Sequence, residues 1–270
     1  MSVRVAAVQM TSGVDVAANL ATAAGSIEAA AAAGARLVVL PENFAAMSSD
    51  EANRCALAEP DGHGPLQDFL AETAARCRVW LVGGTVPIAG DDPLRPFAAA
   101  LVFADDGRRV ARYDKMHLFD VGIPGSGEHY GESRHTQPGT TPSLVETPWG
   151  GLLVAVCYDL RFPELFRHFP SARQRIIALP AAFTVPTGEA HWATLVRARA
   201  IENLCFVIAA AQTGRHESGR RTHGHSMIVS PWGKTIAEAG VEPGFIVGDL
   251  DLAFQDQTRK QFPALEHRRL

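Results

Sequence analysis

The chain has 270 residues, of which 47% are hydrophobic and 20% are charged, a composition typical of a folded globular protein and unlike that of a disordered one. Its formal net charge is −4, and no basic run is longer than Arg220–Arg221. This mildly acidic balance gives no electrostatic reason to expect nucleic acid or an anionic membrane as a partner. The length is sufficient to bury a large core.

The N-terminal sequence MSVRVAAVQM has no basic leader followed by a continuous apolar segment, so we expect no secretory signal and a cytoplasmic location. Polar residues interrupt the Ala-rich stretch Val16–Leu40, which therefore predicts a soluble helix and not a membrane span. The cysteines Cys55, Cys77, Cys157 and Cys205 form no CxxC pair. Free thiols in a reducing compartment are expected, without a zinc site or a disulfide framework.

Apolar runs rich in Val, Ile and Leu predict buried strands along the chain. They are Val3–Val8, Leu37–Leu40, Val79–Val82, Leu152–Val156, Ile176–Leu179 and Cys205–Ala209. Helical spacing between several of these runs predicts a helix that starts after Asp15 and stops at Gly34, a second over Leu66–Cys77 and a third through Trp192–Ala200. This alternation is typical of the α/β class.

Three segments recur in the same order, which suggests two similar halves. VAAVQM (Val5–Met10) resembles LVAVCY (Leu153–Tyr158), RLVVLPENF (36–44) resembles RIIALPAAF (175–183), and LVFADDGRRVA (101–111) resembles MIVSPWGKTIA (227–237). Short apolar strings also match by coincidence, which is the alternative. If the repeat is real, two sheets face each other with helices outside, so we predict a four-layer α-β-β-α sandwich in one domain over residues 1–270.

Cys157 lies where the predicted strand LLVAVC bends into YDLRFPELF, and Pro163–Glu164 is a helix-start signal. A thiol near a helix N-terminus loses part of its ionisation cost, and only the thiolate is a strong nucleophile. Cys157 is therefore a candidate nucleophile. The alternative is a buried core cysteine, since free cysteine is among the most buried residue types.

Glu42 and Lys115 are the matching candidates for acid–base and oxyanion chemistry. Glu42 follows a buried strand and Pro41, where a desolvated carboxylate would suit a general base; the alternative is a loop acid or a helix cap. Lys115, in ARYDKMHLF, is one of only three lysines among 25 cationic residues. A compact ammonium suits an oxyanion, although a chance surface lysine is equally compatible with this pattern.

Metal and nucleotide sites are not expected. His223 and His225 form a His-x-His pair without a third ligand at metal spacing, so we interpret them as structural. The glycine-rich spots lack the GxGxxG and GxxxxGK[ST] spacings that cradle phosphates. The ten histidines permit a papain-like Cys–His pair, but the sequence around the cysteine does not resemble that family. No cofactor is predicted.

LPENF around Glu42, YDKMHLFD around Lys115 and VAVCYDLRFPEL around Cys157 together resemble the Glu-Lys-Cys motifs of the nitrilase superfamily, in the family's order. The likeness runs along essentially the whole chain. It implies a nitrilase-like fold, a catalytic Glu42–Lys115–Cys157 triad and a further carboxylate, Glu132 in HYGES, that helps to position the lysine and the substrate. It also implies hydrolysis of a small linear amide through a cysteine thioester, with the Tyr158 backbone N–H as an oxyanion donor.

Within the superfamily, IPGSGEHYGES, GEAHWATLVRARAIEN and AAAQTGRHESGRRTHGHSMIVSPWG resemble the branch that hydrolyses deaminated glutathione. This resemblance implies that Arg161 and Phe183, together with Thr184, bind the keto-acid end of the substrate. The alternatives are an omega-amidase acting on alpha-ketoglutaramate, an N-carbamoyl hydrolase, a true nitrilase, or a non-catalytic binding domain of the same fold. We expect Arg197, Arg199 and Glu202 to form helix-surface or subunit contacts. Relatives pair through such helices, which implies a homodimer or a larger homo-oligomer.

Overall fold

The computed structural model describes residues 1–47, 55–125 and 127–269. Within these residues a first sheet has seven strands. In spatial order they are β17 (Gly244–Asp251), β1 (Ser2–Gln9), β2 (Leu37–Val39), β3 (Trp80–Val82), β5 (Phe97–Phe103) and β4 (Val86–Ile88), with β6 (Arg109–Asp114) also paired to β5.

A second sheet has six strands in the described part of the chain. They are, in order, β16 (Thr235–Glu238), β15 (Met227–Val229), β12 (Phe206–Ala211), β11 (Gln174–Ala181), β10 (Gly150–Val154) and β9 (Ser143–Thr147). Two small hairpins are separate from both sheets: β7 (Asp120–Gly122) with β8 (His129–Gly131), and β13 (Thr213–Arg215) with β14 (Arg221–His223).

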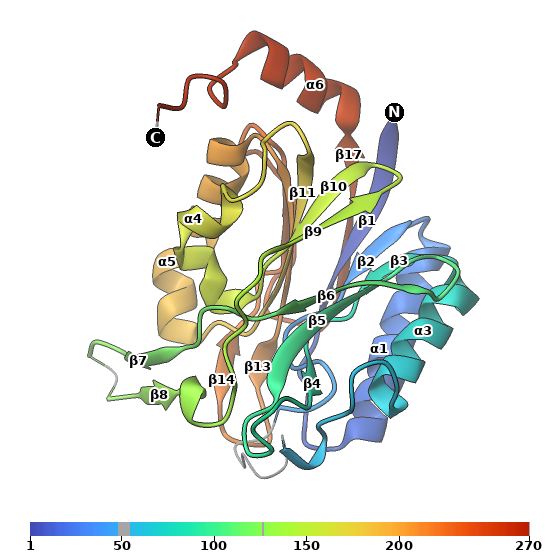
Figure 1. Ribbon diagram of the computed structural model, residues 1–270, viewed down its shortest axis with the longest axis vertical. Coiled ribbons are helices and arrows are strands. Elements are labelled where there is room, and N and C mark those ends of the chain that lie inside the picture. The colour runs from blue at the N-terminus through green and yellow to red at the C-terminus, as the bar shows by residue number, and fades with distance from the viewer. Residues whose placement is uncertain (48–54, 126, 270) are drawn as a thin grey trace.

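Four of the described helices cover the outer faces of the two sheets, and α6 (Leu252–Gln261) lies at one end of the sandwich (Figure 1). The helices are α1 (Val16–Ala32), α3 (Pro65–Cys77), α4 (Pro163–Phe166), α5 (Val185–Asn203) and α6, with short 3-10 segments η1 (Glu132–Arg134) and η2 (Cys157–Arg161). Helices α1 and α3 lie outside the first sheet, and α4 and α5 lie outside the second (Figure 1). The predicted α-β-β-α arrangement is confirmed.

The strand pairings confirm the internal repeat. Along β17-β1-β2-β3-β5-β6 the successive pairs are antiparallel, parallel, parallel, antiparallel and antiparallel. Along β9-β10-β11-β12-β15-β16 the same sequence of pairings occurs. The repeated strings fall on corresponding strands, since β1 matches β10 and β2 matches β11. The Glu42 motif therefore follows β2 in the first half and the Cys157 motif follows β10 in the second, at positions that do not correspond in the repeat.

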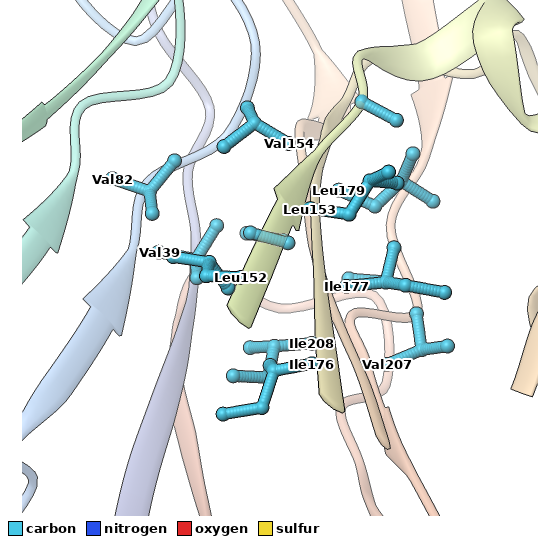
Figure 2. Close-up of a cluster of buried hydrophobic side chains, with 14 of the residues drawn as sticks. Val39, Val82, Leu152, Leu153, Val154, Ile176, Ile177, Leu179, Val207 and Ile208 are labelled. Carbon is cyan, nitrogen blue, oxygen red and sulfur yellow. The ribbon is translucent and has the colours of Figure 1, made fainter. Parts of the chain in front are cut away.

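Successive side chains of each strand point to opposite faces of its sheet, so one set packs between the two sheets and the other set packs on the outer face. Figure 2 shows Val39 and Val82 of the first sheet facing Leu152 of the second, whereas Leu153 and Ile177 lie on the opposite face of the second sheet. All five side chains are fully buried. Strands buried on both faces read as continuous apolar runs, which is why all six predicted strands are confirmed as β1, β2, β3, β10, β11 and β12.

The helix boundaries follow local signals. Asp15 caps α1, its carboxylate accepting from the Ala18 N–H at 3.2 Å, and the chain leaves this helix through Gly34 at φ +90°. Thr184 caps α5 by accepting from the Thr187 N–H. In the described residues, every helix is too short or too polar to cross a membrane.

Candidate active site

The predicted site residues lie at strand ends that meet around one cavity. Glu42 follows β2, Lys115 follows β6, Cys157 follows β10, and Ala182 follows β11. All four line a cavity of about 660 Å³. The hairpins β7–β8 and β13–β14 lie at the same end of the sandwich (bottom of Figure 1) and contribute further wall residues. Parallel strands present their carboxyl ends at one edge, so the topology brings distant residues together.

The ion cluster at the bottom of the cavity joins three segments. Lys115 Nζ donates to Glu42 Oε1 at 2.8 Å and to the two Glu132 carboxylate oxygens at 2.9 and 2.8 Å. Lys115 is only 2% exposed and Glu42 4%. The Phe119 N–H also donates to Glu132, at 2.7 Å, which orients this second carboxylate. Burial alone lowers the pKa of Lys115, but Glu132 and then Glu42 outweigh it and raise that pKa, so the ammonium stays charged.

Cys157 is placed beside the Glu42 carboxylate by a strained bend. Its φ is +50°, a left-handed conformation that is uncommon outside glycine and that turns β10 directly into η2. Cys157 is 7% exposed, and the Glu42 carboxylate, the Lys115 ammonium and the Ala182 N–H are close enough to shift the pKa of its thiol. The cysteine therefore shares one cavity with the ion-paired carboxylate and ammonium, as the sequence motifs predict.

The expectation that a helix N-terminus favours the Cys157 thiolate is wrong. Helix α4 has only four residues and begins beyond η2, at Pro163. Burial and the Glu42 charge raise the pKa of the Cys157 thiol well above its usual range, and Lys115 and the Ala182 N–H offset only part of this. The Cys157 thiol is therefore neutral, and a carboxylate lies close to it.

Several buried polar residues that the motifs did not reveal hold the Glu42 segment. Gln212 is fully buried and its Nε2 donates to the Glu42 carbonyl at 3.0 Å and to Ser12 Oγ at 2.8 Å. The Asn43 N–H donates to Thr85 Oγ1 at 2.9 Å. Gly84, in the glycine pair after β3, has φ +56° and packs so closely on the Pro41 carbonyl that a Cβ atom would overlap it.

Asp159 connects the cysteine bend to the lysine segment. Its carboxylate is fully buried and accepts from the Val156 N–H at 2.8 Å and from Tyr113 Oη at 2.7 Å. It also accepts from the His117 N–H at 3.1 Å and lies 2.6 Å from His117 Nδ1. The backbone on both sides of Cys157 and Lys115 is thereby held by one side chain.

The predicted substrate-binding residues form one wall of the cavity. Tyr158, Arg161, Phe183 and Thr184 all line it. The Arg161 guanidinium lies 5.3 Å from the Phe183 ring centroid and 5.8 Å from that of Tyr158, and its Nη1 donates to His191 Nδ1 at 3.2 Å. The Arg161 side chain thus contacts two aromatic rings in the wall of the cavity that Cys157 also lines.

The expected surface role of Arg199 is wrong. Arg199 is 5% exposed, and its Nε donates to the Leu160 carbonyl at 2.9 Å while the guanidinium packs 5.2 Å from the Phe166 ring centroid. Its ion pair with Glu202 lies beside this contact. Arg199 therefore supports η2 from behind. Arg197 donates to the Gly233 carbonyl at 2.9 Å, within the same chain.

His223 and His225 contact each other and the neighbouring strand β16. The rings stack at 4.6 Å, and His225 Nδ1 lies 3.2 Å from Glu238 Oε1. Burial and the neighbouring His225 lower the pKa of His223. Among residues 1–47, 55–125 and 127–269, no three His, Cys, Asp or Glu side chains are grouped so that they could hold a metal ion.

The repeat also explains why there is one such cluster and not two. Gln9 stands where Cys157 stands in the second half, and it is buried. Its side chain donates to the Gly240 and Glu242 carbonyls at 2.8 Å each and accepts from the Ser226 N–H at 2.8 Å. The first-half position thus ties strands together instead of presenting a nucleophile.

Comparison with known proteins places the chain in a family. The carbon-nitrogen hydrolase model matches residues 4–260. The deaminated glutathione amidase of Synechocystis sp. (strain PCC 6803 / GT-S) is 40% identical over 272 residues, covering 97% of this chain and 97% of that protein. The NitFhit protein of Caenorhabditis elegans has a TM-score of 0.92 at 37% identity, over 99% of this chain and 65% of that longer chain. Saccharomyces cerevisiae Nit3, a member of branch 10 of the nitrilase superfamily, has a TM-score of 0.89 at 31% identity, over 100% and 97% of the two chains.

The four-layer fold, the cysteine–carboxylate–lysine cluster and these matches agree: the chain belongs to the carbon–nitrogen hydrolase family of the nitrilase superfamily. It is a hydrolase of carbon–nitrogen bonds other than peptide bonds, and its similarity over nearly the full length makes it an amidase.

Proposed function

We propose that the whole chain, residues 1–270, is one amidase domain that cleaves deaminated glutathione, using Cys157 as nucleophile, Glu42 as general base and acid, and Lys115 as electrostatic stabiliser. The observation that carries this proposal is the thiol–carboxylate–ammonium cluster, buried at the bottom of the cavity. The reaction needs only protein side chains, so no cofactor is part of the proposal.

In the first half of the reaction, Glu42 takes the Cys157 proton while Sγ forms a bond to the amide carbonyl carbon. The negative charge that develops on the carbonyl oxygen is stabilised by the Lys115 ammonium and the Tyr158 backbone N–H; one such donor is worth about 3–4 kcal/mol. Glu42 then gives its proton to the leaving nitrogen, the C–N bond breaks, and the acyl group remains on sulfur as a thioester.

In the second half, Glu42 takes a proton from water, the resulting hydroxide adds to the thioester, and the C–S bond breaks with return of the proton to Cys157. Glu132 keeps its charge throughout. Its bonds to Lys115 and the Phe119 N–H hold the ammonium in place when Glu42 becomes protonated. The high thiol pKa supports a carboxylate-assisted attack, because no thiolate has to exist in the resting enzyme.

The substrate assignment is supported by Arg161. With Lys115 shared by two carboxylates, the bottom of the cavity does not attract an anionic substrate. A guanidinium binds a carboxylate with two parallel hydrogen bonds, and Arg161 lines the same cavity as Cys157, with its guanidinium packed on the Phe183 ring. We assign the keto-acid carboxylate of the acyl group to Arg161, with Phe183 and Thr184 completing this end. The name of the Synechocystis relative supports the choice of deaminated glutathione.

Steady-state kinetics on deaminated glutathione and alpha-ketoglutaramate, with the released amine or ammonia and the keto acid both measured, tests this function. The wild type is expected to hydrolyse deaminated glutathione with the higher kcat/KM, and Cys157→Ala to be inactive but folded. A preference for alpha-ketoglutaramate would instead identify an omega-amidase. Release of carbon dioxide from an N-carbamoyl amine would identify a carbamoyl hydrolase. Appreciable amide hydrolysis by Cys157→Ala would reject the nucleophile.

The proposal includes a homodimer that acts in the cytoplasm. Ile201, Trp232 and Phe262 are 48%, 58% and 52% exposed and adjoin one another near the ends of α5 and α6. Large exposed apolar groups in contact favour a two-fold interface. The four cysteines are free, as a reducing compartment requires. Light scattering of the wild type and Trp232→Asp tests the interface: the wild type should have twice the monomer mass, and the variant the monomer mass.

A further inference from the structure

A second guanidinium lines the cavity and is not used by the reaction steps above. Arg220 lies in the turn between β13 and β14, and its backbone carbonyl accepts from the His216 N–H at 2.9 Å. The side chain packs 5.3 Å from the Tyr130 ring centroid, and its Nη2 donates to the Ala182 carbonyl at 3.1 Å. The backbone and the guanidinium of Arg220 are therefore both held in place.

The hydrogen-bonding capacity of Arg220 is largely unused. Its Nε is buried and has no hydrogen-bond partner among the described residues. In that part of the chain Arg220 also has no ion pair with a carboxylate, and Glu128 on the same wall instead accepts from Tyr130 Oη at 2.6 Å. A guanidinium has five donors, and buried donors are nearly always satisfied. The site therefore suits an anionic group of a ligand.

The position of Arg220 relative to the thiol identifies which part of the substrate it meets. The Ala182 N–H is close enough to Cys157 to lower the pKa of its thiol, and the Ala182 carbonyl accepts from Arg220, while the ring of the next residue, Phe183, lies 5.3 Å from the Arg161 guanidinium. The two guanidinium groups thus contact neighbouring residues, Ala182 and Phe183, in the cavity that Cys157 also lines. A substrate attacked at its carbonyl carbon by Cys157 can therefore place its acyl end at Arg161 and its leaving amine at Arg220.

We infer that Arg220 is a specificity-determining residue that binds a carboxylate on the leaving amine, so that the enzyme selects amides whose amine product is itself an amino acid or peptide with a free carboxyl end. This inference rests on the proposed function, which assigns the acyl carboxylate to Arg161. The two arginines then make the cavity complementary to a substrate with one carboxylate on each side of the scissile bond. A substrate with two negative charges needs both arginines, because three carboxylates that would repel it, those of Glu42, Glu128 and Glu132, line the same cavity.

A chemical double-mutant cycle tests the inference. The two substrates are deaminated glutathione and its analogue with the glycine carboxylate converted to a carboxamide, and the enzymes are wild type, Arg220→Gln and Arg220→Lys. The wild type should prefer the carboxylate form by about 10- to 100-fold in kcat/KM, the range for a charge-assisted hydrogen-bonded pair. Arg220→Gln should reduce that preference to less than about threefold, and Arg220→Lys should restore part of it, because a single charge replaces the two-pronged donor.

Arg215→Gln is the matched control, because Arg215 is an exposed arginine on the paired strand of the same hairpin and is not part of the cavity wall. It should keep the wild-type preference; a loss there equal to that of Arg220→Gln would show a general charge effect and overturn the inference. The inference is also overturned if Arg220→Gln keeps the wild-type preference for the carboxylate substrate, or if the wild type has no such preference. If Arg220→Gln loses the same factor in kcat/KM on both forms of deaminated glutathione and on alpha-ketoglutaramate, Arg220 acts only through its hydrogen bond to Ala182, and the inference is overturned.

The same experiment separates this inference from the proposed function. If the wild type hydrolyses alpha-ketoglutaramate but neither form of deaminated glutathione, the enzyme is a keto-acid amidase and the inferred carboxylate site for the leaving amine is rejected. If the wild type hydrolyses none of the three amides, the proposed function fails and the subsite fails with it.

Discussion

Replacing Asp159 by asparagine removes one charge beneath the nucleophile with almost no change in shape. The carboxylate has two contacts at each oxygen: Tyr113 Oη and the Val156 N–H at Oδ2, and the N–H and ring Nδ1 of His117 at Oδ1. Asparagine has only one oxygen. In either orientation of the amide, its NH₂ group faces one of the two backbone N–H donors, at Val156 or at His117.

The expected loss of stability in Asp159→Asn depends on which of the four partners can accept a hydrogen bond from the new NH₂ group. The Tyr113 hydroxyl and the His117 ring can each accept a hydrogen bond from the new NH₂, but a backbone N–H cannot. One buried donor is left without a partner, and the remaining bonds lose their ionic acceptor, so the free energy of unfolding should fall by roughly 2–4 kcal/mol. For a chain of this size this corresponds to a decrease in Tm of roughly 5–15 °C.

The activity of Asp159→Asn should fall more than its stability suggests. Val156 precedes Cys157, so a shift of about 1 Å in its backbone misplaces the thiol and costs about 100-fold in kcat. Tyr113→Phe is the milder partner variant, because it removes the bond to Asp159 and the long 3.4 Å bond from the Met116 N–H but leaves the Val156 and His117 N–H groups satisfied; it should lose about 1–2 kcal/mol. Calorimetry and steady-state kinetics measure both effects. A wild-type Tm together with kcat/KM within twofold of wild type for Asp159→Asn would refute the reasoning.

Three further predictions concern charge and protonation. Lys115→Met leaves Glu42 and Glu132 buried beside each other without a cation, so it should cost about 3–5 kcal/mol in urea unfolding and abolish turnover; wild-type stability would contradict the buried cluster. Because burial and Glu42 raise the pKa of the Cys157 thiol, wild type and Cys157→Ser should show equal thiolate absorbance up to about pH 9; an extra thiolate in the wild type below that pH would count against carboxylate-assisted attack. Burial lowers the pKa of His216 below that of the unfolded chain, so its contribution to stability is complete above about pH 6.5 and is lost as the pH falls through the lower folded-state pKa. Denaturant unfolding at several pH values should show this loss and a smaller one in His216→Asn; equal pH dependence in the two proteins would exclude His216 as its source.

The residues that the sequence predicts well are those that follow an unmistakable local pattern. Glu42 and Cys157 each follow a continuous apolar run, and such runs form strands buried on both faces. The strands β2 and β10 do not correspond in the repeat, but the residues that follow them line the same cavity. The four layers could therefore be predicted from these patterns, whereas the triad and the cavity residues Arg161 and Phe183 were predicted from the resemblance to the nitrilase superfamily.

The residues that the sequence did not reveal act through contacts between distant segments. Gln212 bonds to the backbone at Glu42, and Asp159 bonds across to the lysine segment. No spacing rule predicts such contacts, because each depends on the packing of one half against the other. Arg199 has the helical spacing of a surface residue, yet η2 packs over it and buries it.

The protonation state of Cys157 was mispredicted for a physical reason. A strand followed by a helix-start signal suggested a stabilised thiolate, but the 3-10 segment η2 separates the thiol from α4. Burial and the adjacent carboxylate then dominate the pKa of the thiol. The distance to a helix end and the depth of the site depend on the tertiary structure and could not be obtained from the motif.

Rapid acid quenching of the wild type during turnover of deaminated glutathione, followed by intact-mass measurement and peptide mapping, tests the covalent mechanism most directly. The account predicts that a fraction of the enzyme gains the mass of the keto-acyl group, that the group is on the peptide containing Cys157, and that alkaline hydroxylamine removes it. Turnover without any acylated protein, or acylation at the buried Cys205 while Cys157 remains free, would contradict it.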